Sequence, residues 1–484
     1  MSWLLAAVVS GALALFSTYW DDSLHTDAGR DTFWSAPHVL LYGSILGTLA
    51  ALACWGWSKL RRQGLAAAAT DPLLRWAAAS GAAVGIAAPA DAAWHSAFGR
   101  DAVLWSPPHL LAIVATFALT ATLLRAIMRE GGTGLPAAMG GALVLAAALV
   151  PVMEYESDVP QFSTVWFLPV AGMGVTLAVV VLRRFDDHPW AVTRAALLVT
   201  AARLLMLPVL AGLGYSTPIV PPVVVVAVAV DVIHRRHGSA WWLPAAVPLG
   251  VHVAYVPLLP LMPHGAAVAA GQIAPSILLG VAGSALVVLA AEGLPHGSRR
   301  ITQAGGVAAL LGLLFAVPLM NATPARAHDP GQGAAAGQAQ WNAQVRDDSI
   351  DVTLTTTGPA LAPTGLIARR AGEELTGRLV VDADGVARGS ISLRADRRWF
   401  LYATFRDGQN RPAETWIPVQ RDSGRTIAES RPVYLPSAET EVTGKSLATV
   451  ALYGMAAALL VAVARSGPKG LTAMPTKNDA PTTQ

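Results

Sequence analysis

The sequence predicts an all-α polytopic membrane protein with about twelve spanning helices and one small extracytoplasmic β-domain. The composition is the first observation, because 54% of the 484 residues are hydrophobic and only 13% are charged, whereas soluble domains carry about 25% charged residues. A net charge of +3, with basic residues only in short clusters, predicts no nucleic-acid partner. The single cysteine, Cys54, excludes an intrachain disulfide and a thiolate metal cluster.

The second observation is the spacing of long apolar runs, since a bilayer-spanning helix needs roughly 20 apolar residues. The expected spans are 3–20, 37–58, 73–93, 108–128, 133–153, 164–182, 189–213, 217–233, 240–260, 273–292, 301–321 and 445–465. Basic clusters follow the even-numbered spans and include Arg62, Arg129, Arg184, Arg236 and Arg300. By the positive-inside rule, both termini are expected in the cytoplasm of a multi-pass plasma-membrane protein. The first span is expected to be retained, because it lacks a basic n-region and a cleavage site.

The third observation is a polar stretch, 328–440, in which strand-like alternation is separated by turn sequences. Short strands at such spacing predict an Ig-like or cupredoxin-like β-sandwich, which the topology places outside the cell. The runs begin at Ile350, Gly377, Gly389, Trp399 and Trp416. The last helix, 441–466, tethers this domain, and 467–484 is expected to be a disordered cytoplasmic tail.

A second sequence feature precedes the β-domain. Ala325-Arg-Ala-His328 follows a hydrophobic segment and resembles a processing site that would expose His328 as a new N-terminus. Because internal cleavage is unusual, we expect an uncut helix that continues into a linker. His328 therefore remains only a further candidate ligand.

Residues 1–130 contain a tandem repeat of a two-helix unit, which precedes further spans in 131–322. Both copies follow the pattern D-x3-H-x3-G-R-D-x(2–3)-W-S-x-P-H and share nine identities. Asp and His at a spacing of four lie on one face of a helix. Proline begins the next helix and places a second histidine in its first turn. Each copy can thus bring one carboxylate and two imidazoles together.

Such a donor set predicts a metal site, because imidazole suits copper, zinc, iron and nickel, and ionisable groups near a bilayer are costly unless functional. The predicted ligands are Asp21, His25, His38, Asp91, His95 and His109. The residues expected to brace the loops are Arg30, Asp31, Arg100 and Asp101. Two alternatives use the same residues, namely a purely structural repeat and a proton or ion relay.

D-x3-H-x12-H in the first copy and D-x3-H-x13-H in the second resemble the metal-site pattern of the C subunit of particulate methane and ammonia monooxygenases, in the copper membrane monooxygenase superfamily. The segments Arg30-Asp31, Pro37-His38 and Tyr42-Gly43-Ser44 are similar as well. The resemblance covers about residues 1–130. It implies one copper site at Asp21, His25 and His38, and a second at His95 and His109. Asp91 stands where that family usually has asparagine.

Acidic residues at the outer end of the fifth span are further candidate ligands or a cation-binding site, although such residues are usually only solvated. They are Glu154, Glu156 and Asp158. Arg203 lies deep in the seventh span, where it is expected to pair with a carboxylate such as Asp231 or Glu154.

The sequence favours a copper-dependent membrane monooxygenase, or a monooxygenase-like subunit, that oxidises a small apolar substrate with dioxygen. The alternative is a copper-binding or copper-transport membrane protein without turnover, and a third candidate is a scaffold or proton-coupled transporter. The expected partners are the lipid bilayer and either partner membrane subunits or further copies of the chain.

Overall fold

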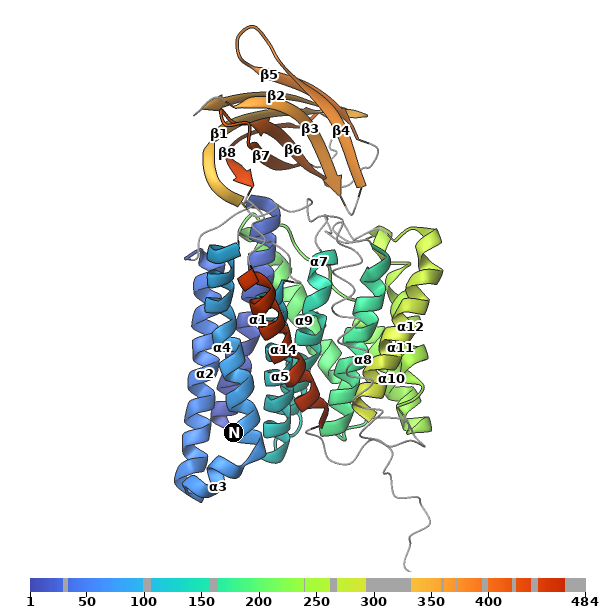
Figure 1. Cartoon of the computed structure of the whole chain (residues 1–484). Coiled ribbons are helices and arrows are strands. Elements are labelled where there is room, and N and C mark those ends of the chain that lie inside the picture. Colours follow the sequence, from blue (N-terminus) through green and yellow to red (C-terminus); the bar gives the residue numbers. More distant parts are fainter. Residues whose placement is uncertain are drawn as a thin grey trace, which may run out of the picture.

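In the computed structural model, long apolar helices form a bundle with a β-barrel at one end (Figure 1). The structure describes residues 1–28, 34–98, 106–156, 164–238, 240–261, 268–292, 332–357, 361–370, 373–393, 399–419, 424–436 and 443–465. The expected span 301–321 and the tail 467–484 lie outside the described residues. Eight helices within those ranges are long and apolar enough to cross a membrane, so the chain is a membrane protein.

The helices begin and end close to the expected spans. They are α1 (Ser2–Ala28), α2 (Ala36–Gln63), α3 (Leu65–Thr70), α4 (Pro72–Phe98), α5 (Pro107–Arg129), α6 (Leu135–Leu149), α7 (Met153–Glu156), α8 (Phe167–Phe185), α9 (Ala191–Gly212), α10 (Val223–His237), α11 (Leu243–Tyr255), α12 (Ala270–Glu292) and α14 (Thr443–Arg465). With 15 and 13 residues, α10 and α11 are shorter than the expected spans 217–233 and 240–260.

The tandem repeat folds as two helix pairs, α1 with α2 and α4 with α5, which pack on each other along their length (Figure 1). Leucines of α1, α2, α4 and α5 form the core between them, including Leu4, Leu52, Leu73 and Leu111. The helices α6 and α14 pack against α5. The duplication in the sequence is therefore a duplication of one structural unit.

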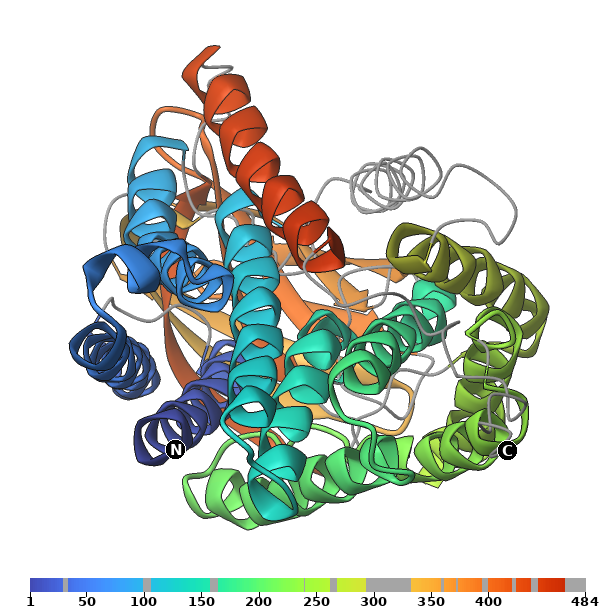
Figure 2. The same ribbon diagram turned by 90° about the horizontal axis from the view of Figure 1, so that it is seen from below.

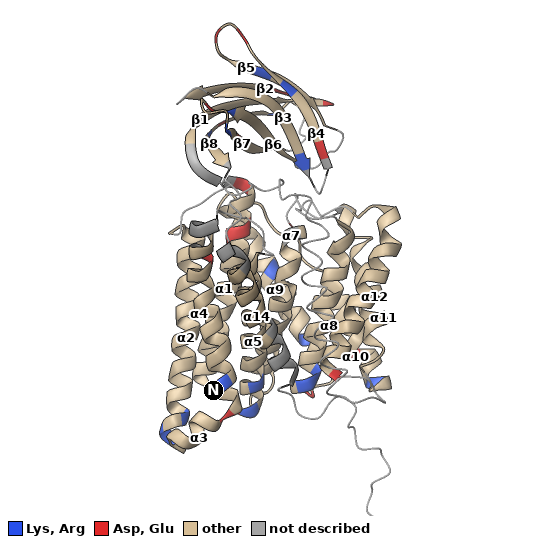
Figure 3. Cartoon of the chain, in the orientation of Figure 1, with Lys and Arg blue, Asp and Glu red and all other residues tan. Residues whose placement is uncertain are grey.

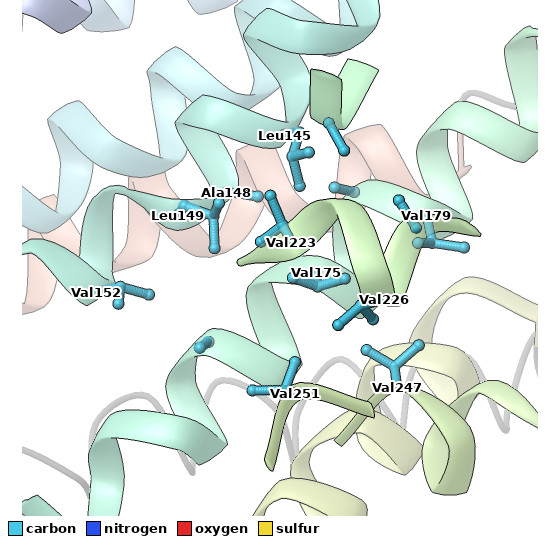
Figure 4. Packing of buried hydrophobic residues seen from close by; sticks show 14 of the residues in the cluster. Leu145, Ala148, Leu149, Val152, Val175, Val179, Val223, Val226, Val247 and Val251 are labelled. Carbon is cyan, nitrogen blue, oxygen red and sulfur yellow. The ribbon is translucent and has the colours of Figure 1, made fainter. Parts of the chain in front are cut away.

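The second half of the bundle is built around α8, and α9 to α12 follow one another in an arc beside it (Figure 2). Valine, leucine and alanine side chains of α6, α8, α10 and α11 interlock in its core (Figure 4). Membrane helices pack through close van der Waals contact and small residues rather than through water exclusion. A Cβ on Gly174 would clash with the Ala148 carbonyl oxygen, so glycine there allows α8 to approach α6.

Most arginine and lysine residues of the bundle lie at the end that faces away from the barrel (Figure 3). Buried ion pairs stabilise this end. Asp231 accepts hydrogen bonds from Arg183 and from the amide and hydroxyl of Thr193. Arg184 pairs with Glu292 at 3.0 Å, which joins α8 to α12.

The β-domain is a closed eight-stranded antiparallel barrel, so the expected sandwich is wrong. The strands are β1 (Gln332–Val345), β2 (Ser349–Thr357), β3 (Ala362–Arg370), β4 (Glu373–Val381), β5 (Ala387–Ser392), β6 (Trp399–Arg406), β7 (Pro412–Val419) and β8 (Thr426–Pro436). Their order is β1-β2-β5-β4-β3-β6-β7-β8. The long β1 pairs with both β2 and β8, and this pairing removes the open edges that a sandwich would keep.

Alternate side chains of the strands fill the interior of the barrel. Ile350, Val352 and Leu354 of β2 point inward with Trp341 of β1. The barrel meets the bundle at α1, where Arg431 Nη2 donates to the Asp27 carbonyl at 2.9 Å. The barrel is therefore attached close to the end of the first repeat helix.

Candidate metal centre

The structure brings Asp21, His25 and His38 together, as the repeat pattern predicts. One ligand atom from each side chain lies within 4.8 Å of those of the other two. Asp21 Oδ1 is 3.2 Å from His38 Nε2 and 3.8 Å from His25 Nε2. The two imidazole rings meet edge to face, with centroids 6.3 Å apart. The cluster therefore joins the end of α1 to the beginning of α2.

The local sequence explains this convergence. The first helix continues through Ala28, so Asp21 and His25 lie one turn apart on the same face. Ser35 then adopts an extended conformation, and Pro37 lies in the first turn of α2. The Ser17 hydroxyl donates to the Pro37 carbonyl and so ties the beginning of α2 to α1. His38, the third residue of α2, is thereby directed toward α1.

A neighbouring aromatic ring orients His38. Tyr42 lies one turn further along α2 and stacks on the His38 ring, with a centroid separation of 5.6 Å and an interplanar angle of 23°. This stacking restricts the rotation of the His38 ring. The sequence contains the signal for this contact in the four-residue spacing of His38 and Tyr42.

The geometry of this cluster fits a small transition-metal ion. Ligand atoms about 2.0–2.2 Å from one tetrahedral ion lie roughly 3.3–3.6 Å apart, close to the separations of 3.2 and 3.8 Å from Asp21 Oδ1. That oxygen is buried, yet it accepts no hydrogen bond of normal geometry from the described residues. Buried carboxylate oxygens normally have a partner. One carboxylate and two imidazoles suit copper or zinc, and they leave further coordination positions open.

The second copy repeats the geometry at the two positions that can be compared. Asp91 Oδ1 lies 3.3 Å from His109 Nε2, and His109 is again the third residue of its helix. The Ser106 hydroxyl shares a hydrogen bond of 3.0 Å with His109 Nδ1, which leaves Nε2 directed at the carboxylate. The one inserted residue therefore does not disturb the Asp91–His109 contact.

Several predicted residues lie outside the described part of the chain. His95 belongs to α4, but the position of its side chain is not among those described. The third ligand of the second cluster therefore stays a prediction. The predicted loop residues Arg30, Asp31, Arg100 and Asp101 also lie outside the described residues.

The first cluster is half-buried at the end of the bundle that faces the barrel. The His38 side chain is 18% exposed and that of His25 is 39% exposed. Large apolar residues beside the cluster are exposed, with Trp34 at 74% and Val39 at 52%. A ligand could thus approach the cluster from the end of the bundle that faces the barrel or along its apolar flank.

The acidic residues after the fifth span do not join the cluster where they are described. Glu156 is fully buried and its Oε2 lies 3.0 Å from Arg203 Nη2. Arg203 therefore pairs with Glu156, whereas the expected partner Asp231 pairs with Arg183. The side chain of Glu154 lies outside the described residues, as do Asp158 and His328.

The barrel cannot form a metal site with imidazole ligands, because it contains no histidine. No histidine follows His328 in the sequence. Its interior is filled by apolar side chains such as Trp341 and Leu401. Within the described residues, the candidate metal ligands therefore lie on the two helix pairs. Comparison with known proteins identifies no family, since no family model matches the sequence and no curated protein matches it significantly.

Proposed function

We propose that the chain is a copper-binding membrane protein that holds one copper ion in each repeat. The ligands of the first ion are Asp21, His25 and His38, and those of the second are Asp91, His95 and His109. The observation that carries the proposal is the convergence of one carboxylate and two imidazoles from two helices. The Asp91–His109 contact in the second copy supports it independently.

The proposed activity is the oxidation of a small apolar substrate by dioxygen, either by this chain or by a complex that contains it. Bound copper supplies the redox chemistry that dioxygen activation requires. Within the chain, Asp21, His25 and His38 would hold the copper ion, and Tyr42 stacks on the His38 ring. The resemblance to the C subunit of particulate methane and ammonia monooxygenases agrees with this assignment.

The surroundings of the first cluster support an apolar substrate. Exposed Trp34 and Val39 present apolar surface beside the ligands. A hydrophobic molecule dissolved in the bilayer can follow such a surface without crossing water. We propose that substrate reaches the cluster laterally from the lipid.

We further propose twelve spans, with both termini in the cytoplasm and with the barrel and both metal sites outside. The support is the separation of basic helix ends from the barrel along the bundle (Figure 3). Reporter fusions after Arg129 and near Ser390 should report opposite sides of the membrane. The same side for both fusions would refute this topology.

Copper handling without turnover is the second candidate. The exposure of His25 at the end of the bundle that faces the barrel favours it, because metal transfer between proteins needs an accessible ligand. Under both proposals the chain acts with partner subunits or with further copies of itself.

One experiment separates the two functions. Membranes that contain the copper-loaded protein and a reductant are supplied with dioxygen and short-chain hydrocarbons, and oxidised products are measured. Product formation that is lost in His38→Ala supports the oxygenase. Copper binding that depends on His38, with no product and with copper transfer to a chelator or acceptor protein, supports copper handling and contradicts the oxygenase.

A further inference from the structure

Four polar side chains meet inside the bundle, apart from the metal ligands. Tyr19 comes from α1, Glu156 from α7, Arg203 from α9 and Tyr255 from α11. All four are buried, with exposures of 4%, 0%, 5% and 0% respectively. Polar groups at such depth in a membrane protein are costly and usually functional.

Direct contacts join three of the residues, Tyr19, Glu156 and Arg203, and Tyr255 lies near them. Arg203 Nη2 lies 3.0 Å from Glu156 Oε2. The guanidinium carbon of Arg203 is 3.4 Å from the centroid of the Tyr19 ring. Tyr255 lies within electrostatic range of the other three groups. Its ring packs edge to face on Phe167, with a centroid separation of 5.7 Å, and this contact holds Tyr255 in place.

These contacts leave part of the hydrogen-bonding capacity of the cluster unused. The hydroxyls of Tyr19 and Tyr255, Glu156 Oε1 and Arg203 Nη1 are all buried, and they make no hydrogen bond of normal geometry within the described part of the chain. Leaving four such groups unpaired would cost free energy comparable with the net stability of a protein. Buried polar groups of this kind are satisfied by a bound molecule.

The chemistry of the four atoms defines that molecule. The charges of Arg203 and Glu156 compensate each other, so neither an anion nor a cation is favoured. Arg203 Nη1 can only donate a hydrogen bond, Glu156 Oε1 can only accept one, and the two tyrosine hydroxyls can do both. A small neutral molecule that both donates and accepts hydrogen bonds matches this set. We propose that Tyr19, Glu156, Arg203 and Tyr255 enclose an internal binding site for small hydroxylic molecules, and that water occupies it.

The site is independent of the proposed metal chemistry, because none of its members is a proposed copper ligand. Both groups of residues share α1, where Tyr19 precedes Asp21 by two residues. The site also joins the first repeat helix to α7, α9 and α11 in the second half of the bundle. Water bound here provides a polar contact between the two halves.

X-ray radiolytic footprinting of the full-length protein in detergent tests this site. Hydroxyl radicals that form from bound water label the side chains beside it, even where bulk solvent has no access. We expect hydroxylation of Tyr19 and Tyr255 to be severalfold faster than that of Tyr402, a matched control that is 0% exposed in the barrel. Phe117, 3% exposed in the bundle core, is the second control.

The variant Tyr255→Phe adds a second measurement that keeps most of the packing. It removes one hydrogen-bonding partner of the bound water, so labelling of Tyr19 should fall severalfold while labelling of exposed side chains stays unchanged. Labelling of Tyr19 and Tyr255 at the slow rate of Tyr402 and Phe117 in the native protein would overturn the proposal. Unchanged Tyr19 labelling in Tyr255→Phe would overturn the four-residue site.

Discussion

Asp231 holds α8, α9 and α10 together at the basic end of the bundle, and its replacement by asparagine should be strongly destabilising. Its side chain is completely buried. It accepts a hydrogen bond from Arg183 and two from Thr193, at 2.8 and 2.7 Å. Arg183 is itself 5% exposed, so loss of the carboxylate charge leaves a buried cation without its counter-ion.

Breaking a buried ion pair by removing one partner costs about 3–5 kcal/mol. Asparagine keeps one acceptor oxygen, and Arg183 also donates to the His188 and Pro189 carbonyls. We therefore expect a loss of about 3 kcal/mol for Asp231→Asn, the lower end of that range. The double variant Arg183→Met/Asp231→Leu should lose less than Asp231→Asn, because no buried charge remains.

The assay is equilibrium unfolding of the purified protein in mixed micelles of detergent and SDS, followed by tryptophan fluorescence. Asp351→Asn is the matched control, because its ion pair with Arg346 is exposed, at 40% and 62% for the two side chains. Exposed pairs contribute about 0–1 kcal/mol. Equal, small losses in Asp231→Asn and Asp351→Asn would refute the buried-pair argument.

Two further predictions concern the barrel. Arg431→Ala removes the hydrogen bond to the Asp27 carbonyl, so the loops at this junction should become more accessible to protease, whereas Arg388→Ala on the exposed face should not change cleavage. Asp382 has a pKa below its ordinary value of 3.8, because the Val386 amide and then Arg388 hydrogen-bond its carboxylate. A lowered pKa stabilises the fold above about pH 4, and this stabilisation is lost as the pH falls through the folded-state pKa. Asp382→Asn should therefore lower the unfolding midpoint more at pH 7 than at pH 2. A pH-independent difference would contradict this assignment.

The helices could be predicted because their signal is local. Each run of about 20 apolar residues can satisfy its backbone only as a helix in a bilayer, and the described helices follow those runs. The ends were less predictable. The first helix continues past Trp20 to Ala28, because its polar last turns extend beyond the apolar segment that defines a span.

The barrel could not be distinguished from a sandwich because closure depends on non-local pairing. The side chains of Ile350, Val352 and Leu354 point inward and alternate with more exposed residues, as they would in a strand of a barrel or of a sandwich. The deciding contact is the pairing of β1 with β8, about 90 residues apart, as between Trp341 and Glu429. Neither strand has the continuous β-branched pattern that predicts a strand.

The candidate metal centre was predictable where its ligands are close together in the sequence and lie on regular helices. The four-residue spacing of Asp21 and His25 and the proline before His38 define their directions. The pair of Arg203 and Glu156 was not predictable, because the helices that carry them meet only through tertiary packing. The unsatisfied hydroxyls of Tyr19 and Tyr255 depend on the same packing.

Copper stoichiometry of the purified protein tests the central claim most directly. The native protein, loaded with copper and freed of excess metal, should bind about two equivalents, and X-ray absorption should show nitrogen and oxygen ligands at about 2.0–2.2 Å. His25→Ala should lose about one equivalent, whereas His252→Ala, whose native ring hydrogen-bonds to Ser276, should lose none. Copper content that is unchanged in the double variant His25→Ala/His95→Ala would contradict the account and leave the repeat with a purely structural role.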